Sequence, residues 1–120
     1  MPKRILVVED NDDLRGMSCD ALSLAGFSIT EAANGLDALR HLDNDRPDLI
    51  VLDLRLPQFS GIEIRQELLA NTHTRGIPIV VVSGSPQDLG NLAVKCVLTK
   101  PVLPDQLVAT VWRWLGLSHD

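Results

Sequence analysis

Short apolar runs alternate along the chain with longer stretches that mix apolar and polar residues. The first, third and fourth runs are almost wholly apolar, as expected for strands that helices cover on both faces of a parallel sheet. The second run is more polar, which favours a place at an edge of the sheet. From this pattern we predict five strands, at residues 4–8, 27–30, 48–54, 79–82 and 96–98.

The stretches between these runs are typical of amphipathic helices. After the first run, apolar residues recur at intervals of three and four, at Leu14, Met17, Ala21 and Ala25. Asn11 stands at the N-cap position of this helix, and Gly26 stands at its end. Further helices are predicted from residue 36, from residue 62 and over 104–115, with at most a short one at 89–94.

A strand followed by a helix, repeated five times, predicts an α/β fold with a parallel sheet and helices on both faces. Because crossovers between parallel strands are right-handed, a chain covers both faces only by reversing its winding direction once. Such a doubly wound sheet forms a crevice at that reversal, at the carboxyl ends of the strands. The length of 120 residues suits one domain, which we place at residues 1–120.

Composition and charge narrow the class of protein. The chain is 45% hydrophobic and 22% charged, which is ordinary for a globular protein, and no apolar stretch approaches the ~20 residues of a membrane span. The run ILVV near the start is too short for the core of a signal peptide. A net charge of −5 without a basic cluster argues against nucleic-acid binding by this chain alone. Cys19 and Cys96 lack metal-ligand spacing and are expected to be buried free thiols in the cytoplasm.

Polar residues gather where the predicted strands end. Glu9 and Asp10 follow the first strand, Asp53 lies at the end of the third, Ser83 ends the fourth and Lys100 follows the fifth. In a parallel sheet these ends share one edge, so the three carboxylates are expected close together. Such a group calls for a cation, and Mg²⁺ suits a site with few protein ligands. A flavin mononucleotide site is excluded, because VEDNDD would repel a bare phosphate.

Taken singly, most of these residues have a structural explanation. Asp12 and Asp13 suit the first turn of a helix, where they complement its dipole, and a lone Ser83 or Lys100 would be an ordinary loop residue. Asp53 is harder to explain in this way, because it lies in an otherwise buried strand. The histidines show no triad or ligand spacing and are expected in solvent: His41, His73 and His119.

The two tryptophans lie in the last predicted helix. Trp114 shares an apolar stripe with residues 107, 108, 111 and 115 and is expected in the core. Trp112 lies about 100° away from that stripe. It either covers the edge of the core or provides a contact for a partner.

Five segments in this order resemble the receiver domain of response regulators, the phosphoacceptor of two-component signalling. They are ILVVEDN, AANGLDAL, PDLIVLDLRLPQFSG, IPIVVVSG and LTKP, and the resemblance covers essentially the whole chain. It implies a flavodoxin-like sheet with strand order 2-1-3-4-5, in which the first and third strands are neighbours.

The resemblance also implies a role for each site residue. Asp53 would be the phosphoacceptor, a nucleophile that becomes an aspartyl phosphate. Mg²⁺ would be held by Asp53, by Asp10 directly, by Glu9 through water and by the backbone carbonyl of Arg55.

The remaining residues would contact the phosphoryl group or shape its surroundings. Lys100 would pair with one phosphoryl oxygen, and the Ser83 hydroxyl would donate a hydrogen bond to another. Gly84 would keep the approach open, and the Lys100–Pro101 peptide would be cis. Arg55 and Ser85 flank the site and would tune the lifetime of the phosphoryl group.

The sequence departs from the usual receiver pattern in two places. Val97 stands where receivers commonly have Tyr or Phe, and a β-branched residue with one χ angle cannot repeat the inward swing of that aromatic switch. Only sixteen residues separate Ser83 from Lys100, which predicts a shortened fourth helix. Both changes fall on the face that receivers usually use for output and dimerisation. We therefore expect output through another surface, such as the first helix, or transfer of the phosphoryl group to a histidine of another protein in a phosphorelay.

The sequence thus favours a cytoplasmic, Mg²⁺-dependent phosphoacceptor that assists its own phosphorylation and dephosphorylation but is not a conventional enzyme. Its donor would be a histidine kinase or a histidine phosphotransfer protein, and its oligomeric state is left open. One alternative is a receiver-like interaction module that acts without phosphorylation. Another is a phosphatase of the haloacid dehalogenase type, but that family needs two aspartates two residues apart, whereas Glu9 and Asp10 are adjacent.

Overall fold

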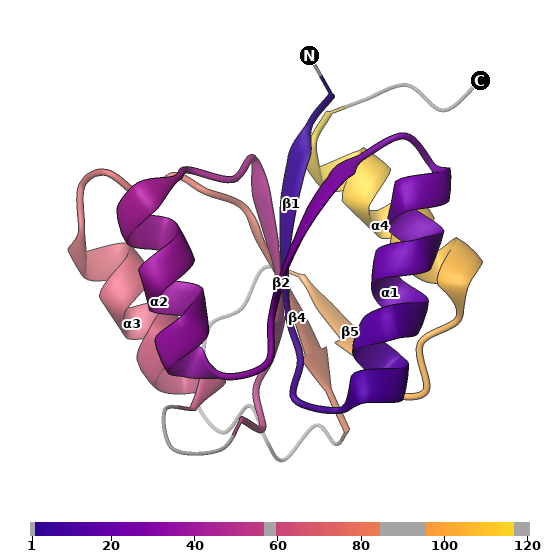
Figure 1. Ribbon diagram of the computed structural model, residues 1–120, viewed down its shortest axis with the longest axis horizontal. Helices are drawn as coiled ribbons and strands as arrows, with labels where there is room; N and C mark the ends of the chain where they lie inside the picture. Colours follow the sequence, from indigo (N-terminus) through magenta and orange to yellow (C-terminus); the bar gives the residue numbers. More distant parts are fainter. Residues whose placement is uncertain (1, 57–59, 85–95, 117–120) are drawn as a thin grey trace.

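The computed structural model describes residues 2–56, 60–84 and 96–116 (Figure 1). Its centre is a five-stranded parallel sheet in the order β2-β1-β3-β4-β5, so the predicted fold class and strand order are confirmed. The strands are β1 (Arg4–Val8), β2 (Ser28–Ala32), β3 (Leu49–Asp53), β4 (Ile79–Ser83) and β5 (Val97–Thr99).

Helices cover both faces of the sheet (Figure 1). On one face lie α1 (Asp12–Leu24) and α4 (Pro104–Trp114), and on the other lie α2 (Gly35–Asn44) and α3 (Gly61–Ala70). Over the three ranges that the structure describes, no helix is both long and apolar enough to cross a membrane. The short helix predicted at 89–94 and the shortening of the fourth helix fall outside these ranges.

The core divides into two clusters because successive residues of a strand point to opposite faces. In β1, Ile5 and Val7 belong to the cluster under α1 and α4, and Leu6 and Val8 belong to the cluster under α2 and α3. β3 alternates in the same way, and both strands are buried on both sides. Double burial is therefore the reason that these runs show no polar interruption in the sequence.

The edge strand β2 begins one residue later and ends two residues later than predicted. Its burial alternates poorly, so hydropathy gave a weak signal for its bounds. Phe27, predicted to start the strand, instead lies before it, and its amide donates a hydrogen bond to the Leu22 carbonyl. Its buried ring packs against Trp112 of α4, with 5.7 Å between ring centroids.

Helix starts follow the sequence signals closely. The Asn11 side chain accepts a hydrogen bond of 3.0 Å from the Leu14 amide, which confirms Asn11 as the N-cap of α1. At the start of α3, Ser60 and Glu63 form a capping box. These local caps fix where the helices begin relative to the carboxyl edge of the sheet.

Three side chains are less or more buried than expected. Trp114 was expected in the core and Cys96 was expected to be buried, but both are half-buried, since they pack against the rim of the cluster under α1 and α4. Trp112 is half-buried and covers the edge of that cluster, which is one of the two places predicted for it. His41 was expected in solvent but is half-buried, whereas His73 is exposed.

Candidate functional site

The carboxyl edge of the sheet gathers the residues that the sequence analysis selected. Glu9 follows β1, and Asp53 ends the neighbouring strand β3, in register opposite Val82 of β4. Ser83 ends β4 opposite Thr99, the residue before Lys100. The parallel pairing therefore brings these side chains together from four different strands, as the strand order predicts.

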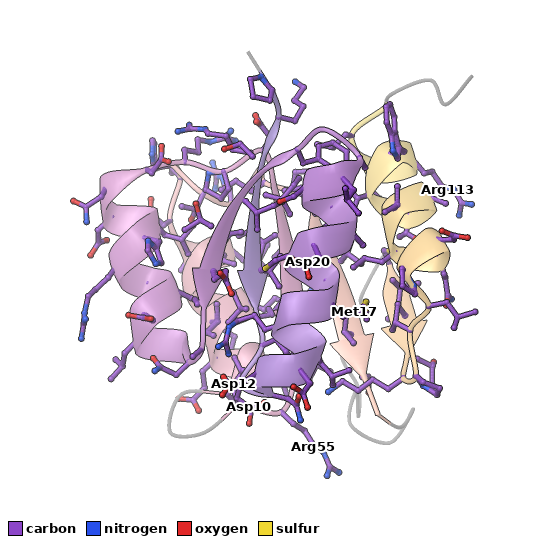
Figure 2. The ribbon with its side chains drawn as sticks, turned by 45° about the vertical axis from the view of Figure 1, so that its right-hand side comes forward. Asp10, Asp12, Met17, Asp20, Arg55 and Arg113 are labelled. Carbon is purple, nitrogen blue, oxygen red and sulfur yellow. The ribbon has the colours of Figure 1, made fainter. Side chains whose placement is uncertain are left out.

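The three carboxylates form one compact group. Glu9, Asp10 and Asp53 each offer an oxygen, and these oxygens all lie within 4.8 Å of one another. Glu9 and Asp53 are 6% and 2% exposed, whereas Asp10 is exposed. Asp10 lies at the same end of the molecule as Arg55 (Figure 2). Clustered hard oxygen ligands with one open side fit Mg²⁺, which binds through a few carboxylates and retains water.

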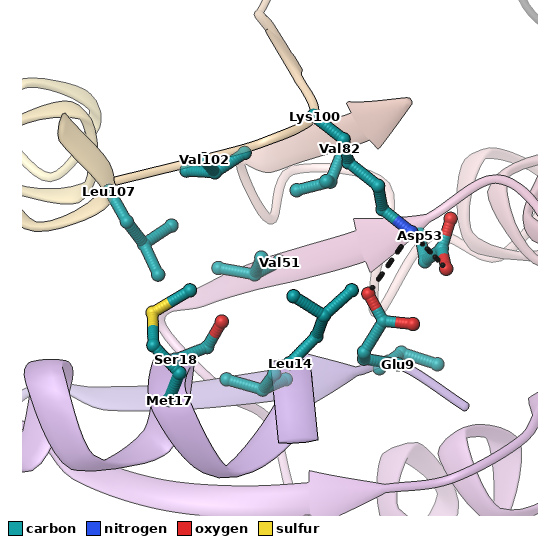
Figure 3. A pocket seen from close by; sticks show the side chains of 12 residues that line it. Glu9, Leu14, Met17, Ser18, Val51, Asp53, Val82, Lys100, Val102 and Leu107 are labelled. Atoms are coloured by element: carbon teal, nitrogen blue, oxygen red, sulfur yellow. Dashed lines mark hydrogen bonds and ion pairs between the residues drawn. The ribbon is translucent and has the colours of Figure 1, made fainter. Parts of the chain in front are cut away.

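Lys100 provides the positive charge within this group. Its Nζ lies 3.1 Å from Asp53 Oδ2 and 3.4 Å from Glu9 Oε1 (Figure 3). Its amide donates a hydrogen bond of 2.8 Å to the Ser83 carbonyl, which ties β5 to the end of β4. The Lys100–Pro101 peptide is cis, the isomer that the resemblance implies.

Burial and mutual proximity shift the ionisation of these groups. Burial raises the pKa of Glu9 to about 7, with a further contribution from Asp53, against smaller opposing effects of the Asn11 amide and Lys100. Burial alone would lower the pKa of Lys100, but the hydrogen bond and charge of Asp53, together with Glu9, raise it above its ordinary value. The Lys100 ammonium therefore stays charged, and the Glu9 carboxylate is protonated more readily than an ordinary glutamate.

The other selected residues surround this group. The Arg55 amide donates a hydrogen bond of 3.0 Å to Asp53 Oδ1, so both oxygens of Asp53 are held. Ser83 is 2% exposed at the end of β4, and Gly84 beside it is exposed. Val97 begins β5 and is half-buried. Ser85 lies outside the described residues.

A small cavity of about 30 Å³ lies beside the charged group, between α1 on one side and α4 with the segment before it on the other (Figure 3). Met17 and Ser18 line it from α1, Val102 and Leu107 line it from the opposite side, and Val51 lines it from the sheet. The lining is mostly apolar. The ammonium and the carboxylates thus meet against a wall of low polarity, where charge interactions are stronger than in water.

Two residues that touch the site, Gly61 and Arg15, had no role predicted from the sequence. Gly61 begins α3, and a Cβ at this position would lie 2.6 Å from the Leu54 Cα and closer still to the Asp53 carbonyl. Arg15 of α1 donates a hydrogen bond of 2.9 Å to the Glu9 carbonyl. The available signals were a glycine before an amphipathic run and an arginine one helical turn beyond Asn11. Neither residue type indicates which distant backbone group it contacts.

The fold and this group of residues define a class of protein: a doubly wound α/β domain with a carboxylate cluster at its crevice. Residues 5–112 match the family model described as the response regulator receiver domain. The chain belongs to that family.

Two curated relatives illustrate the similarity. The chain is 30% identical to the polar-differentiation response regulator DivK of Brucella anthropi, over 97% of this chain and 98% of DivK. It is 36% identical to the phosphate regulon transcriptional regulatory protein PhoB of Escherichia coli, over 92% of this chain but only 51% of PhoB. The chain thus spans nearly all of one relative and about half of the other.

Solved structures show the same fold. The receiver domain of the sensor histidine kinase PA1611 from Pseudomonas aeruginosa superposes with a TM-score of 0.89 at 29% identity, covering 97% of this chain and 99% of that one. That structure is described with a magnesium ion coordinated in its active-site cleft. The chemotaxis response regulator CheY4 of Vibrio cholerae gives a TM-score of 0.86 at 25% identity, over 94% of this chain and 98% of that one.

Proposed function

We propose that residues 1–120 form a phosphoacceptor domain that takes a phosphoryl group onto Asp53 from a phosphorylated histidine, in a reaction that depends on Mg²⁺. One observation carries the proposal: the Asp53 carboxylate lies at a strand end with two further carboxylates within 4.8 Å and an ammonium at 3.1 Å. The magnesium ion described for the PA1611 receiver supports the choice of metal, since the same kind of site is assigned to a relative.

The contacts of Asp53 suit a nucleophile. Arg55 holds Oδ1 through its amide and Lys100 holds Oδ2, so the carboxylate is oriented before the donor arrives. An oxygen of Asp53 would attack phosphorus, the bond from phosphorus to the histidine nitrogen would break, and its electron pair would stay on that nitrogen. Mg²⁺ held by Asp10, Asp53 and the Arg55 carbonyl, and by Glu9 through water, would neutralise charge on the phosphoryl oxygens.

Other residues would respond to the bound phosphoryl group. Lys100 would exchange its contact with the carboxylate for one with a phosphoryl oxygen, and the Ser83 hydroxyl would donate a hydrogen bond to another. Gly84 would leave room for this approach. Because Val97 cannot act as an aromatic switch, the response would pass through the displaced Lys100 and Ser83 to the segments that they join.

The partners follow from this chemistry. The donor would be a histidine kinase or a histidine phosphotransfer protein, and the phosphorylated state would signal to a further protein or return the phosphoryl group to another histidine. Both cysteines are free thiols, which suits an exchange in the reducing cytoplasm. The domain would assist its own phosphorylation and dephosphorylation without turning over a separate substrate.

The direct test is incubation with acetyl phosphate and MgCl₂, followed by the mass of the intact protein. We expect one phosphoryl adduct, its loss on Asp53→Asn, and its loss when a chelator removes Mg²⁺. Asp20→Asn, which removes an exposed carboxylate on α1, is the matched control and should retain the adduct (Figure 2). An adduct that survives Asp53→Asn would overturn the assignment.

The same experiment separates the two alternatives. A chain that takes up no phosphoryl group from acetyl phosphate or from a phosphorylated histidine protein would be an interaction module. Steady release of phosphate from unrelated monoesters would indicate a phosphatase instead.

A further inference from the structure

Arg15 binds three groups at once beside the carboxylate cluster. Its Nη1 donates to the Glu9 carbonyl at 2.9 Å, its Nη2 lies 2.6 Å from Asp12 Oδ1, and its Nε lies 3.2 Å from Glu31 Oε1. The side chain is only 16% exposed. All three directions of the planar guanidinium are therefore used, and they join α1 to the ends of β1 and β2.

The contact with Glu9 completes the restraint of that residue. The Glu9 amide donates to the Ala32 carbonyl at 3.0 Å, and its carboxylate accepts from the Asn11 amide at 3.2 Å and meets Lys100 at 3.4 Å. The Glu9 carbonyl has no such bond to β2, and it accepts its hydrogen bond from Arg15 instead. Glu9 is thus held through its amide, its carboxylate and its carbonyl, and the carbonyl, bound by Arg15, belongs to the peptide that leads into Asp10.

Asp10 depends on this peptide more than its neighbours do. Its carboxylate is exposed, and no hydrogen bond or ion pair to another described residue orients it. The direction in which it leaves the backbone is therefore set by the Glu9–Asp10 peptide. Loss of a residue that orients a metal ligand in this indirect way commonly lowers metal affinity by about 10- to 100-fold.

We propose that Arg15 is a positioning residue for the cation site, holding the Glu9–Asp10 peptide so that both carboxylates converge with Asp53. The inference rests on the proposed Mg²⁺ site, and it concerns metal binding rather than phosphoryl transfer. Asp12 and Glu31 orient the guanidinium and balance its charge, so that a cation is placed beside an arginine without strong repulsion.

If Arg15 acted only through its charge, its removal would change the Mg²⁺ affinity in the opposite direction. Removing a positive group near a Mg²⁺ site would tighten cation binding if Arg15 acted only through its field. Removing a positioning group would weaken binding in spite of the lost positive charge. The direction of the change therefore distinguishes the two roles without any assumption about its size.

The test is a titration of the ¹⁵N-labelled chain with MgCl₂ and no phosphodonor, following the backbone amide signals of residues 9–11. We expect Arg15→Met to weaken Mg²⁺ binding by about tenfold, and Arg15→Lys to weaken it as well, because an ammonium keeps the charge but not the fork. With Mg²⁺ at saturation, both variants should be phosphorylated by acetyl phosphate at rates within about twofold of the wild type, since positioning is then restored by the metal.

Arg4→Met is the matched control. Arg4 also pairs with a carboxylate, that of Asp45, and donates to a main-chain carbonyl, that of Arg46, but it lies at the amino end of β1. Its loss should leave Mg²⁺ binding within about twofold of the wild type. Thermal melts of all variants show that the chains compared are folded.

Four outcomes would overturn the inference: unchanged or tighter Mg²⁺ binding by Arg15→Met, wild-type binding by Arg15→Lys, equal weakening by Arg4→Met, or slow phosphorylation that persists at saturating Mg²⁺. A wild-type chain whose residues 9–11 do not respond to Mg²⁺ would overturn both this inference and the proposed site. A chain that binds Mg²⁺ but is never phosphorylated would overturn the proposed function alone.

Discussion

The two ends of the sheet use the same kind of contact in different surroundings. At the amino end, Arg4 pairs with Asp45, and the two side chains are 47% and 50% exposed. At the carboxyl end, Lys100 pairs with Glu9 and Asp53, whose side chains are only 8% and 3% exposed. The Arg4 guanidinium thus pairs with one exposed carboxylate, whereas Lys100 pairs with two buried carboxylates and has a third, that of Asp10, close to them.

Burial changes what these contacts do. An exposed ion pair contributes about 0 to 1 kcal/mol, because water screens the charges and the side chains lose freedom. A buried group with more carboxylates than cations costs stability, since desolvation and repulsion are only partly offset. Repulsion among the carboxylates at the carboxyl end is therefore unfavourable, and a bound cation would reduce it. The exposed ion pair at the amino end has no such excess of negative charge.

The largest effect on stability is expected from Gly61→Ala, which tests how rigidly the carboxyl end is built. The new Cβ would collide with backbone atoms of Asp53 and Leu54, which have no rotamer to yield. We expect a loss of about 3 kcal/mol in the free energy of unfolding, at the upper end of overpacking effects. Urea denaturation followed by circular dichroism measures it.

Gly16→Ala is the control for this substitution. Gly16 lies within α1, and a Cβ there would meet no atom within 4 Å. Alanine should therefore stabilise the chain by up to about 1 kcal/mol through helix propensity. If both alanine variants changed stability alike, the close approach of α3 to the end of β3 would be refuted.

The second effect concerns Lys100→Met, which leaves the buried carboxylates without their cation. We expect a loss of about 2 kcal/mol in the free energy of unfolding at pH 8 in chelator, less than for a fully buried pair because Lys100 is 28% exposed. The loss should shrink at pH 5, where Glu9 is protonated. Lys3→Met, at an exposed lysine of the amino end, should have little effect, and a loss equal to that of Lys100→Met would contradict the comparison.

The third effect is a pH dependence that belongs to Glu9. Its pKa rises from 4.5 to about 7 in the folded chain, so the folded state keeps a proton that the unfolded state has released. This contribution to stability is complete below pH 4.5 and is lost as the pH rises to about 7. We expect the loss to be on the order of 1 to 2 kcal/mol in chelator, since partial solvation reduces the full linkage.

Glu9→Gln removes the titrating group and should flatten the stability profile over this interval. Denaturation midpoints measured at pH 5, 6, 7 and 8 in chelator would show the change, and Glu67→Gln, at an exposed residue of α3, should retain the wild-type slope. A slope that survives in Glu9→Gln would mean that another group carries it.

The same contrast explains how far the sequence could predict the molecule. Uninterrupted apolar runs mark β1, β3 and β4 because both faces of these strands are covered, and the carboxylates could be placed on one edge because parallel strands end together. The bounds of β2 were shifted because an edge strand with mixed burial gives no clear period. A strand that is buried on both faces can therefore be predicted from its continuous apolar run, whereas a strand with mixed burial leaves no clear pattern of hydropathy.

Contacts between a side chain and a distant backbone were beyond the sequence for a different reason. Arg15 meets Glu31, sixteen residues away, and the Glu9 carbonyl, and only the assembled sheet brings them to one point. The sequence alone does not show whether a glycine such as Gly61 faces open space or the backbone of another segment. The site was predictable as a set of side chains, but the groups that support it were not.

The smallest effect is expected at the amino end, from Arg4→Met. The exposed pair with Asp45 should contribute about 0.5 kcal/mol or less, even though Arg4 also donates to the Arg46 carbonyl. The effect should diminish further in 0.5 M salt, because screening acts on exposed charges, whereas the loss in Lys100→Met should persist. Urea denaturation at low and high salt measures both variants side by side. If Arg4→Met lost nearly as much free energy of unfolding as Lys100→Met, burial would not be the cause of the difference between the two ends. The carboxylates at the carboxyl end would then give no reason to expect a bound cation.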